Sequence, residues 1–572
     1  MPNLKKSFVV LCHIFISTLL FGQTVINSVY DIKKQAIGKK AMVVSAHPLA
    51  SKIGAKIIKN GGNAVDAAIA VQFALAVVYP QAGNIGGGGF MVYRGKNGDV
   101  ATLDYREMAP SSSSRNMYLD KNGNVIEGLS LNGHLAAGVP GSVDGMYESF
   151  LKYSKLKNWK KLVQPACKLA KKGFKITKQE ADNLNDLKKE FIKYNTSTPV
   201  FVKEEAWEIG DILVQKDLAN TLKEIKNKGK AGFYQGKVAD LIVAEMKKGN
   251  GIITHEDLKN YRSIWRKPIV GKYRGCEIIG MPPPSSGGIA TLQILGILEN
   301  SPMEQFGFHS PKSVHAIIEA ERRVYADRSA HLGDPDFFNV PIDNLLNMSY
   351  LRKRFESINP SQASKSSDIK AADFAPKESE QTTHLSIVDD EGNAVSITTT
   401  LNNSYGARTV VTGAGFILND EMDDFSVKPG APNLYGLVGG EANAVQPGKR
   451  MLSSMTPTIV TKDGKLLLVL GTPGGSTIIT SVLQTIINVV DYKMNAKDAT
   501  HAPRFHHQWL PDVVFIEQPN LLPEKTLEEL KKMGHTFKMR GNIGRVESIL
   551  VQPDGALEGA ADKRGDDHAE GF

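Results

Sequence analysis

The sequence Glu380-Gln381-Thr382-Thr383-His384-Leu385-Ser386-Ile387-Val388-Asp389 marks an abrupt change in the character of the chain. Before it, residues 357–381 are rich in Ser, Lys, Asp and Ala, a composition typical of a mobile surface segment. From Thr383 to Asp389 the pattern alternates with period two, and residues 394–400 repeat that alternation after Asp390-Glu391-Gly392-Asn393. This pattern predicts a β-hairpin that begins directly at Thr382.

Thr382 is a candidate nucleophile because of this position. A threonine hydroxyl reacts poorly unless a nearby base takes its proton, and the α-amine of the same residue is one known base. A free α-amine titrates at about 7.7 to 8.0, close to working pH. That amine exists only if the peptide bond between Gln381 and Thr382 is cut. Two threonines at the start of a strand also fit ordinary β propensity, so the residues alone leave both interpretations open.

Outside this junction the chain alternates between apolar helices and strand pairs. The 572 residues are 41% hydrophobic, enough for a large core in one or several domains. Residues 60–79 are small and apolar nearly all round, which predicts a buried helix. Hairpins are predicted over 90–106 and 456–471, followed by a helix over 477–491. These elements together indicate a layered architecture of helices and sheets.

The first 23 residues are typical of an export signal. Lys5 and Lys6 precede an apolar stretch from Phe8 to Phe21, which is shorter than the roughly 20 residues that span a membrane. We therefore expect an exported protein, periplasmic or secreted, without stable membrane insertion. After removal of the signal only Cys167 and Cys276 remain, and their spacing leaves open whether they pair.

The net charge of +9 is unevenly distributed along the chain. Residues before Thr382 are strongly basic, whereas those from Thr382 onward carry more Asp and Glu than Lys and Arg. The basic residues form dispersed pairs such as Lys188-Lys189 without interleaved aromatic side chains, so a nucleic-acid surface is not expected. Opposite charge on the two parts favours their association.

Short motifs follow one another over nearly all of the chain after the signal. Upstream of the junction they are Gly61-Gly62-Asn63-Ala64-Val65-Asp66-Ala67, Asp104-Tyr105-Arg106-Glu107-Met108-Ala109-Pro110 and Pro282-Pro283-Pro284-Ser285-Ser286-Gly287-Gly288. From the junction on they are Thr382-Thr383-His384, Thr400-Leu401-Asn402, Asp420-Glu421-Met422-Asp423-Asp424-Phe425-Ser426, Leu452-Ser453-Ser454-Met455, Pro473-Gly474-Gly475-Ser476 and Ala502-Pro503-Arg504-Phe505-His506-His507-Gln508-Trp509. In identity and order these motifs resemble the gamma-glutamyltranspeptidase family.

The resemblance implies an α+β fold, the four-layer α-β-β-α sandwich of the N-terminal-nucleophile hydrolases. It implies a precursor that cuts itself between Gln381 and Thr382, giving a large chain of residues 24–381 and a small catalytic chain of residues 382–572. The implied reaction transfers the gamma-glutamyl group of glutathione and related compounds, through an ester on Thr382, to water, an amino acid or a dipeptide. It needs no metal and no cofactor.

The resemblance also assigns roles, and each suits the chemistry of its residue. Arg106 would hold the substrate α-carboxylate through paired donors, with Ser453 and Ser454 adding hydroxyl groups. Asp424, Glu421 and Asn402 would accept from the α-ammonium. Near the reacting carbonyl, the backbone N–H groups of Gly474 and Gly475 would form an oxyanion hole, and Thr400 would support the nucleophile. Tyr435 would lie on a loop that covers the pocket.

Two other functions stay open at this point. A cephalosporin or glutaryl acylase would share the fold and the nucleophile but would prefer an acyl group without the α-ammonium. A non-catalytic periplasmic amino-acid binding protein would keep the pocket and never cut itself. His506-His507 is a weak metal signal, because adjacent residues of a strand point to opposite faces.

Overall fold

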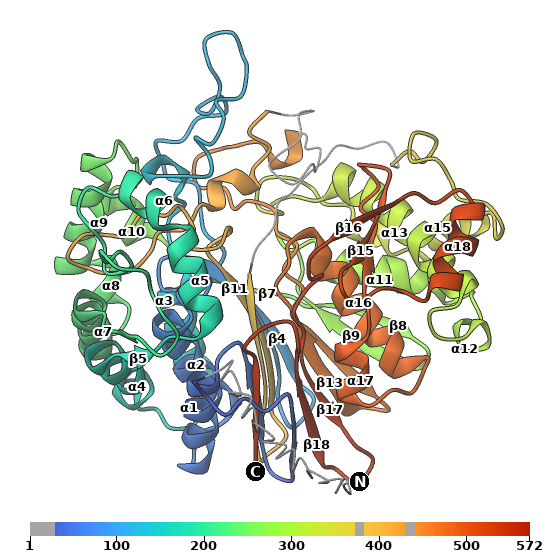
Figure 1. Cartoon of the computed structure of the whole chain (residues 1–572), viewed down its shortest axis with the longest axis horizontal. Helices are drawn as coiled ribbons and strands as arrows, with labels where there is room; N and C mark the ends of the chain where they lie inside the picture. Colours follow the sequence, from blue (N-terminus) through green and yellow to red (C-terminus); the bar gives the residue numbers. More distant parts are fainter. Residues whose placement is uncertain (1–28, 372–381, 429–440) are drawn as a thin grey trace, which may run out of the picture.

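The computed structural model describes residues 29–371, 382–428 and 441–572 (Figure 1). The predicted export signal, Gln381 and Tyr435 lie outside these residues. Among the described residues, no helix combines the length and the apolar composition needed to cross a membrane.

Two antiparallel sheets of seven strands each form the centre of the molecule. In the order of their pairing, the first sheet consists of β19 (His568–Gly571), β2 (Met42–Ser45), β10 (Thr383–Val388), β11 (Ala394–Thr400), β3 (Gly88–Arg94), β4 (Val100–Asp104) and β7 (Ile264–Arg266). The second consists of β1 (Gln35–Gly38), β18 (Leu557–Ala561), β17 (Glu547–Val551), β13 (Lys465–Gly471), β12 (Thr458–Lys462), β9 (Cys276–Gly280) and β8 (Ile269–Tyr273). Both sheets mix strands from before and after Thr382, so neither part completes a sheet alone.

The two sheets face each other through polar as well as apolar contacts. Ser396 Oγ donates to Leu470 O at 2.9 Å, and Ser386 Oγ donates to Glu547 O at 3.0 Å. Both bonds run from β10 or β11 in the first sheet to β13 or β17 in the second. Buried hydroxyl groups at this interface find partners on the opposite sheet, which fixes how the sheets lie on each other.

Helices cover the outer face of each sheet (Figure 1). On the first sheet lie α1 (Pro48–Lys59) and α2 (Ala64–Val78), and on the second lie α11 (Gly287–Leu298), α16 (Ser476–Val490) and α17 (Ala496–His501). Helix α3 (Ser142–Tyr153) also contacts the first sheet, at β3 and β4. Beyond these helices are α4 (Trp159–Lys172), α5 (Lys178–Asp186), α6 (Lys188–Lys193), α7 (Lys216–Lys228), α8 (Ala231–Tyr234), α9 (Lys237–Lys248) and α10 (His255–Asn260). Beyond α11 are α12 (Met303–Phe306), α13 (Pro311–His331), α14 (Ile342–Leu345), α15 (Met348–Glu356) and α18 (Glu524–Lys532).

Short elements complete the chain. They are the strands β5 (Phe174–Lys175), β6 (Ile212–Leu213), β14 (Phe505–His506), β15 (Val514–Glu517) and β16 (Phe537–Arg540), and the single-turn helices η1 (His134–Ala136), η2 (Glu421–Asp424) and η3 (Glu441–Asn443). The mixture of helix and sheet confirms the predicted α+β class.

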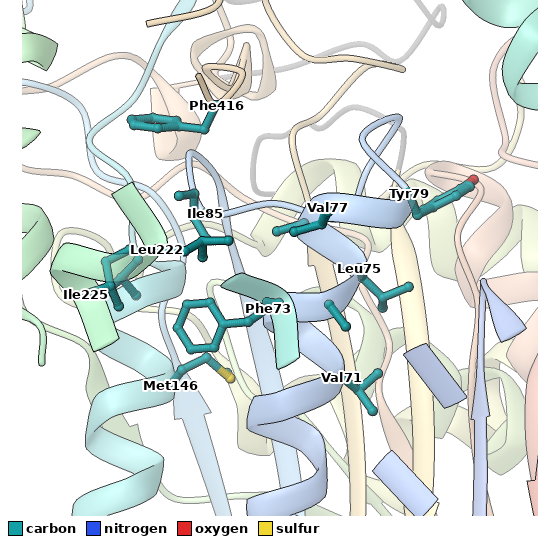
Figure 2. Packing of buried hydrophobic residues seen from close by; sticks show 14 of the residues in the cluster. Val71, Phe73, Leu75, Val77, Tyr79, Ile85, Met146, Leu222, Ile225 and Phe416 are labelled. Atoms are coloured by element: carbon teal, nitrogen blue, oxygen red, sulfur yellow. The ribbon is translucent and has the colours of Figure 1, made fainter. Parts of the chain in front are cut away.

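Helix α2 is buried over its whole length, as its composition predicts. Asn63 caps it and accepts from Asp66 N, while Asp66 accepts from Asn63 N, so the first turn is satisfied within the core. Figure 2 shows Phe73 of this helix pointing toward Leu222 and Ile225 of α7. A helix enclosed by a sheet on one side and helices on the other has no polar face, which explains why the sequence is apolar all round.

Hydrogen bonds hold residues 357–371, the first part of the segment that was predicted to be a mobile surface stretch. Arg323 donates from Nη2 to Ser357 O at 2.7 Å, and Trp509 donates from Nε1 to Ser366 O at 2.9 Å. Ser366 N donates to Asp512 at 2.7 Å. Residues 357–371 lie mostly at the surface, as predicted. The partners that hold them lie far away in sequence, and composition does not reveal these contacts.

Cys167 and Cys276 are both buried and unpaired. The structure therefore settles the question that their spacing left open.

Candidate active site

Thr382 lies directly before β10, one of the inner strands of the first sheet. Its side chain is only 4% exposed. Strands β10 and β11 pair with Thr383 opposite Thr399, so the same register brings Thr382 opposite Thr400. Thr400 Oγ1 in turn accepts a hydrogen bond from Asn402 N at 2.8 Å. Because directly opposite residues of an antiparallel pair share a face, the two threonine hydroxyl groups belong to the same side of the sheet.

His384, two residues along the same strand, lies between the sheets. Its Nδ1 is 2.9 Å from Thr398 Oγ1 and its Nε2 is 3.0 Å from Ser386 Oγ. Burial lowers the pKa of His384 to about 3. A neutral imidazole with both nitrogens engaged and so low a pKa is a poor proton acceptor, so this histidine does not supply a base for Thr382.

The turn Gly474-Gly475 lies at the same end of the sheets. Strand β13 ends at Gly471 directly over His384, so close that a Cβ on Gly471 would lie 2.3 Å from His384 Cε1. Gly474 and Gly475 then adopt φ of +132° and +60°, which favour glycine. Neither glycine N–H donates a hydrogen bond to any other described residue. Gly475 is also the N-cap of the fifteen-residue helix α16, where backbone N–H groups attract negative charge.

Arg106 lies just beyond the end of β4 and is fixed through its backbone. Arg106 N donates to Asp104 Oδ1 at 2.9 Å, and Tyr261 donates its hydroxyl hydrogen to Arg106 O at 2.8 Å. The guanidinium Nη1 lies 2.5 Å from Glu421 Oε2, and Nη2 forms an ion pair with Asp424. All three side chains are at most 4% exposed. The structure thus brings together the residues predicted to bind opposite ends of an amino acid.

Glu421 and Asp424 lie on the single turn η2, which two asparagines hold in place. Asn419 Oδ1 accepts from Glu421 N at 3.1 Å. Asn443 Nδ2 donates to Asp424 O at 2.7 Å, while its Oδ1 accepts from Leu452 N at 3.0 Å. Asn443 therefore ties Asp424 to the segment that carries Ser453. Asn443 could not be identified from the sequence, since a single asparagine in an irregular segment has neither periodicity nor a recognised motif.

The electrostatics of this cluster favour a ligand with both charges. Burial raises the pKa of Glu421 well above its ordinary value, and it raises the pKa of neighbouring Glu107 to about 8. The charge of Arg106 opposes both shifts. Three buried carboxyl groups, Glu107, Glu421 and Asp424, surround one guanidinium. An added ammonium would relieve the excess of acidic groups, and an added carboxylate would need Arg106.

Ser453 and Ser454 are held by the segment of residues 282–286. Ser453 N donates to Pro284 O at 2.8 Å, and Ser286 N donates to Ser453 O at 2.7 Å. Ser454 Oγ accepts from Arg328 Nη2 at 2.9 Å. The role of Arg328 could not be predicted from the sequence, because this residue lies within the long helix α13 and outside every motif.

Two groups of predicted residues therefore meet near one end of the sheets. Thr382, Thr400 and Asn402 form one group, and the Arg106 cluster forms the other. Asn402 Nδ2 links them, since it donates to Asp420 O at 2.9 Å, one residue before Glu421. None of these residues lines the cavity of about 300 Å³ between residues 195–218 and 410–415.

The two adjacent histidines have separate partners. His506 Nε2 lies 2.8 Å from Gln508 Oε1, whereas His507 Nε2 lies 3.3 Å from Asp512 Oδ1. They do not converge on a common point.

The chain matches the family model described as gamma-glutamyltranspeptidase over residues 50–572. It is 49% identical over 545 residues to the glutathione hydrolase proenzyme of Escherichia coli (strain K12), covering 95% of this chain and 93% of that protein. Among solved structures, the cephalosporin acylase from Bacillus halodurans superposes with a TM-score of 0.82 at 26% identity, covering 95% of this chain and 98% of that one.

The gamma-glutamyltranspeptidase from Helicobacter pylori superposes with a TM-score of 0.57 at 48% identity, covering 60% of this chain and 97% of that one. The sequence is thus much closer to these relatives than to this acylase. On the family match and the identity over nearly its whole length, this chain belongs to the gamma-glutamyltranspeptidase family.

Proposed function

We propose that this protein is a self-processing gamma-glutamyltransferase and glutathione hydrolase with Thr382 as its nucleophile. The observation that carries the proposal is the buried cluster of Arg106 with Glu421 and Asp424, which offers partners for both charges of an amino acid beside a hairpin that starts with threonine. The similarity to the glutathione hydrolase proenzyme supports the same activity.

The first step is the cleavage of the chain. Thr382 Oγ1 attacks the carbonyl carbon of Gln381, the peptide bond to Thr382 N breaks, and an ester forms between Gln381 and Thr382 Oγ1. Water hydrolyses this ester and leaves a large chain of residues 24–381 and a small chain of residues 382–572. The two chains together form the α-β-β-α sandwich, since both sheets contain strands from each.

Cleavage frees the α-amine of Thr382, which becomes the proton acceptor. His384 is the titratable side chain on the same strand, and its pKa, lowered to about 3, makes it too weak a base to compete with this amine. The amine takes the hydroxyl proton as Thr382 Oγ1 attacks the substrate gamma-carbonyl, and returns it to the leaving amine. The N–H groups of Gly474 and Gly475 stabilise the oxyanion, where one lost donor typically costs about 2.7 to 4 kcal/mol of activation free energy.

The gamma-glutamyl ester on Thr382 then reacts with water, an amino acid or a dipeptide. Thr400 supports the hydroxyl of Thr382 during both halves of the reaction. Ser453 and Ser454 add hydroxyl groups near the substrate carboxylate, and Asn402 adds an amide near the ammonium.

The acylase alternative fits the cluster less well. A substrate without the α-ammonium leaves Glu421 and Asp424 without a new cation, and both would continue to compete for Arg106. A binding protein that never cuts itself would have no use for an oxyanion site at Gly474 and Gly475.

We propose export to the periplasm or the medium under the control of residues 1–23. N-terminal sequencing of the purified protein tests the function. We expect two chains, the smaller beginning at Thr382, and release of glutamate from glutathione. An unbroken polypeptide that still consumes glutathione would contradict this mechanism.

A further inference from the structure

A buried cluster of two histidines and one glutamate lies on the far side of the second sheet's helices, apart from the site described above. His315 and Glu319 are one turn apart on α13, and His535 follows α18. One ligand atom from each lies within 4.8 Å of the others, and the side chains are 2%, 0% and 4% exposed. Within the described part of the chain, these residues form the one group of three that meets this criterion.

The hydrogen bonds of His315 orient it as a ligand. His315 Nε2 lies 2.8 Å from Asn359 O, and a carbonyl oxygen only accepts, so Nε2 carries the proton. The lone pair of Nδ1 therefore points toward His535, whose Nε2 is 2.8 Å away. A histidine that donates one ring N–H to a backbone carbonyl and turns its other nitrogen inward is the usual arrangement of a metal-binding imidazole.

His535 offers Nε2 as the second imidazole nitrogen of the cluster, 2.8 Å from His315 Nδ1. A cation bound between these two facing nitrogens replaces the proton that they share. The ring proton of His535 then lies on Nδ1, which is buried and has no hydrogen-bond partner among the described residues.

We propose that His315, Glu319 and His535 bind a divalent transition-metal ion of the Zn²⁺ type. Two imidazole nitrogens and one carboxylate favour zinc over calcium or magnesium, which prefer oxygen ligands. The nitrogens must separate from 2.8 Å to roughly 3.3 Å to fit Zn–N bonds of about 2.0 Å at a tetrahedral angle. Water fills the fourth position.

Charges around Glu319 set the strength of the site. Arg323 Nη1 lies 2.7 Å from Glu319 Oε2, and Arg322 Nε lies 3.2 Å from Oε1. Arg322 also pairs with Asp512, so two carboxylates balance the two guanidinium groups. Ser364 N also donates to Glu319 Oε1 at 3.1 Å. The ion must share Glu319 with these three donors, and we expect weaker binding than at a closed zinc site of cysteines.

A cavity of about 210 Å³ lies beside His535 and is lined by Met533, Gly534 and Thr536, which flank His535, and by Arg322 and Ser364. His315, Glu319 and His535 do not line it, so an ion reaches them only when the residues that flank His535 move.

The position of the site has a consequence for chain pairing, which rests on the proposed cleavage. His315 and Glu319 precede Thr382, whereas His535 follows it. In the cleaved protein the ion would join the large chain to the small chain. The site itself needs no cleavage, so the two proposals can fail separately.

Calorimetric titration of the chelator-treated full-length protein with Zn²⁺, together with the visible absorption of bound Co²⁺, tests the proposal. We expect one saturable ion per protein and an absorption band of tetrahedral Co²⁺. His535→Gln should weaken binding at least about tenfold, since it removes one ligand while its amide can still donate to His315. His255→Gln is the matched control, because His255 also contacts a carboxylate, Asp240, but is exposed, and we expect unchanged binding.

The melting temperature provides the second measurement and checks folding. Zn²⁺ should raise it for the wild type and not for His535→Gln, while both melt alike in chelator. Thr382→Ala should bind the ion like the wild type, whether or not it is cleaved. Absence of saturable binding in the wild type, or equal binding by His535→Gln, would overturn the proposal.

Discussion

The guanidinium of Arg106 lies 2.5 Å from the carboxylate of Glu421. The resemblance assigns these two residues to opposite ends of the substrate, so the groups proposed to bind the substrate pair with each other. In the proposed complex a zwitterionic amino-acid head inserts into this pair with no change in net charge, because its carboxylate binds Arg106 and its ammonium binds the acidic partners.

Arg106→Lys should raise KM for glutathione by about ten- to a hundredfold, because lysine cannot offer paired donors to a carboxylate. Self-cleavage should persist, since a positive charge remains beside Glu421. Steady-state kinetics measure the change. Arg94→Lys is the control, a buried arginine of β3 that donates to Gly464 O, and it should keep the wild-type KM. Equal KM values for Arg106→Lys and the wild type would remove Arg106 from substrate binding.

Asp424→Asn should raise KM for glutathione while cleavage into two chains continues. The reason is the loss of the negative charge that attracts the α-ammonium. A glutaryl substrate, which has no ammonium, should lose much less. The neighbouring Asp423→Asn is the control, because Asp423 accepts instead from Ser130 Oγ at 2.6 Å. If both variants impair both substrates alike, Asp424 has no specific contact with the ammonium.

Thr382→Ala should leave the precursor whole, giving one band on a denaturing gel and no glutathione hydrolysis. Thr383→Val is a close control: Thr383 is fully buried, and its hydroxyl has no hydrogen-bond partner among the described residues. It should still give two bands. Two bands from Thr382→Ala would show that another residue performs the cleavage.

Gly474→Ala should lower kcat by about a hundred- to a thousandfold, the usual effect of losing one oxyanion donor. A Cβ there would lie 2.6 Å from Thr477 Oγ1 on a backbone with φ of +132°, so the turn must move. Gly464→Ala separates this effect from general strain, since Gly464 also has positive φ but has open space around it. We expect Gly464→Ala to lose some stability and to keep kcat. A similar kcat loss in both variants would argue against the oxyanion role.

Glu180→Gln should make the protein more stable at alkaline pH. Burial raises the pKa of Glu180 from 4.5 to about 8. The folded state therefore holds a proton that the unfolded state releases, and the stability from this group, complete below pH 4.5, is lost as pH rises toward about 8. Glutamine does not titrate and can still accept from Tyr405, which donates to Glu180 at 2.8 Å.

The measurement is the melting temperature of both proteins across this pH window. The advantage of Glu180→Gln should grow as pH rises from 4.5 to about 8 and then level off. Asp182→Asn, an exposed position on the same helix, should follow the wild-type profile. A constant difference at every pH would mean that ionisation of Glu180 is not involved.

Much of the fold could be predicted from local pattern alone. The hairpin after Thr382 was predicted over 383–389 and 394–400 and is found at Thr383–Val388 and Ala394–Thr400. The buried helix within 60–79 is found at Ala64–Val78. Alternation and apolar content are properties of neighbouring residues, so a strand or a buried helix reveals itself within a short window.

The candidate site could be predicted only as a set of residues. The motifs named Arg106, Glu421 and Asp424, but the ion pairs between them join positions more than 300 residues apart. Asn443, which holds Asp424, and Arg328, which holds Ser454, belong to no motif. Such roles depend on which segments become neighbours when both sheets form.

The amino-acid sequence by itself determined the strand that begins at Thr382, the buried helices and the list of chemically suited side chains, because these follow from composition and spacing along the chain. Tertiary structure decided the rest. Hydrogen bonds to distant residues hold residues 357–371, although their composition is typical of a mobile segment. Cys167 and Cys276 do not form a disulfide. Tertiary structure also brought His315 to His535 across 220 residues. Contacts of this kind depend on distance in space, which packing of the two sheets and their helices sets.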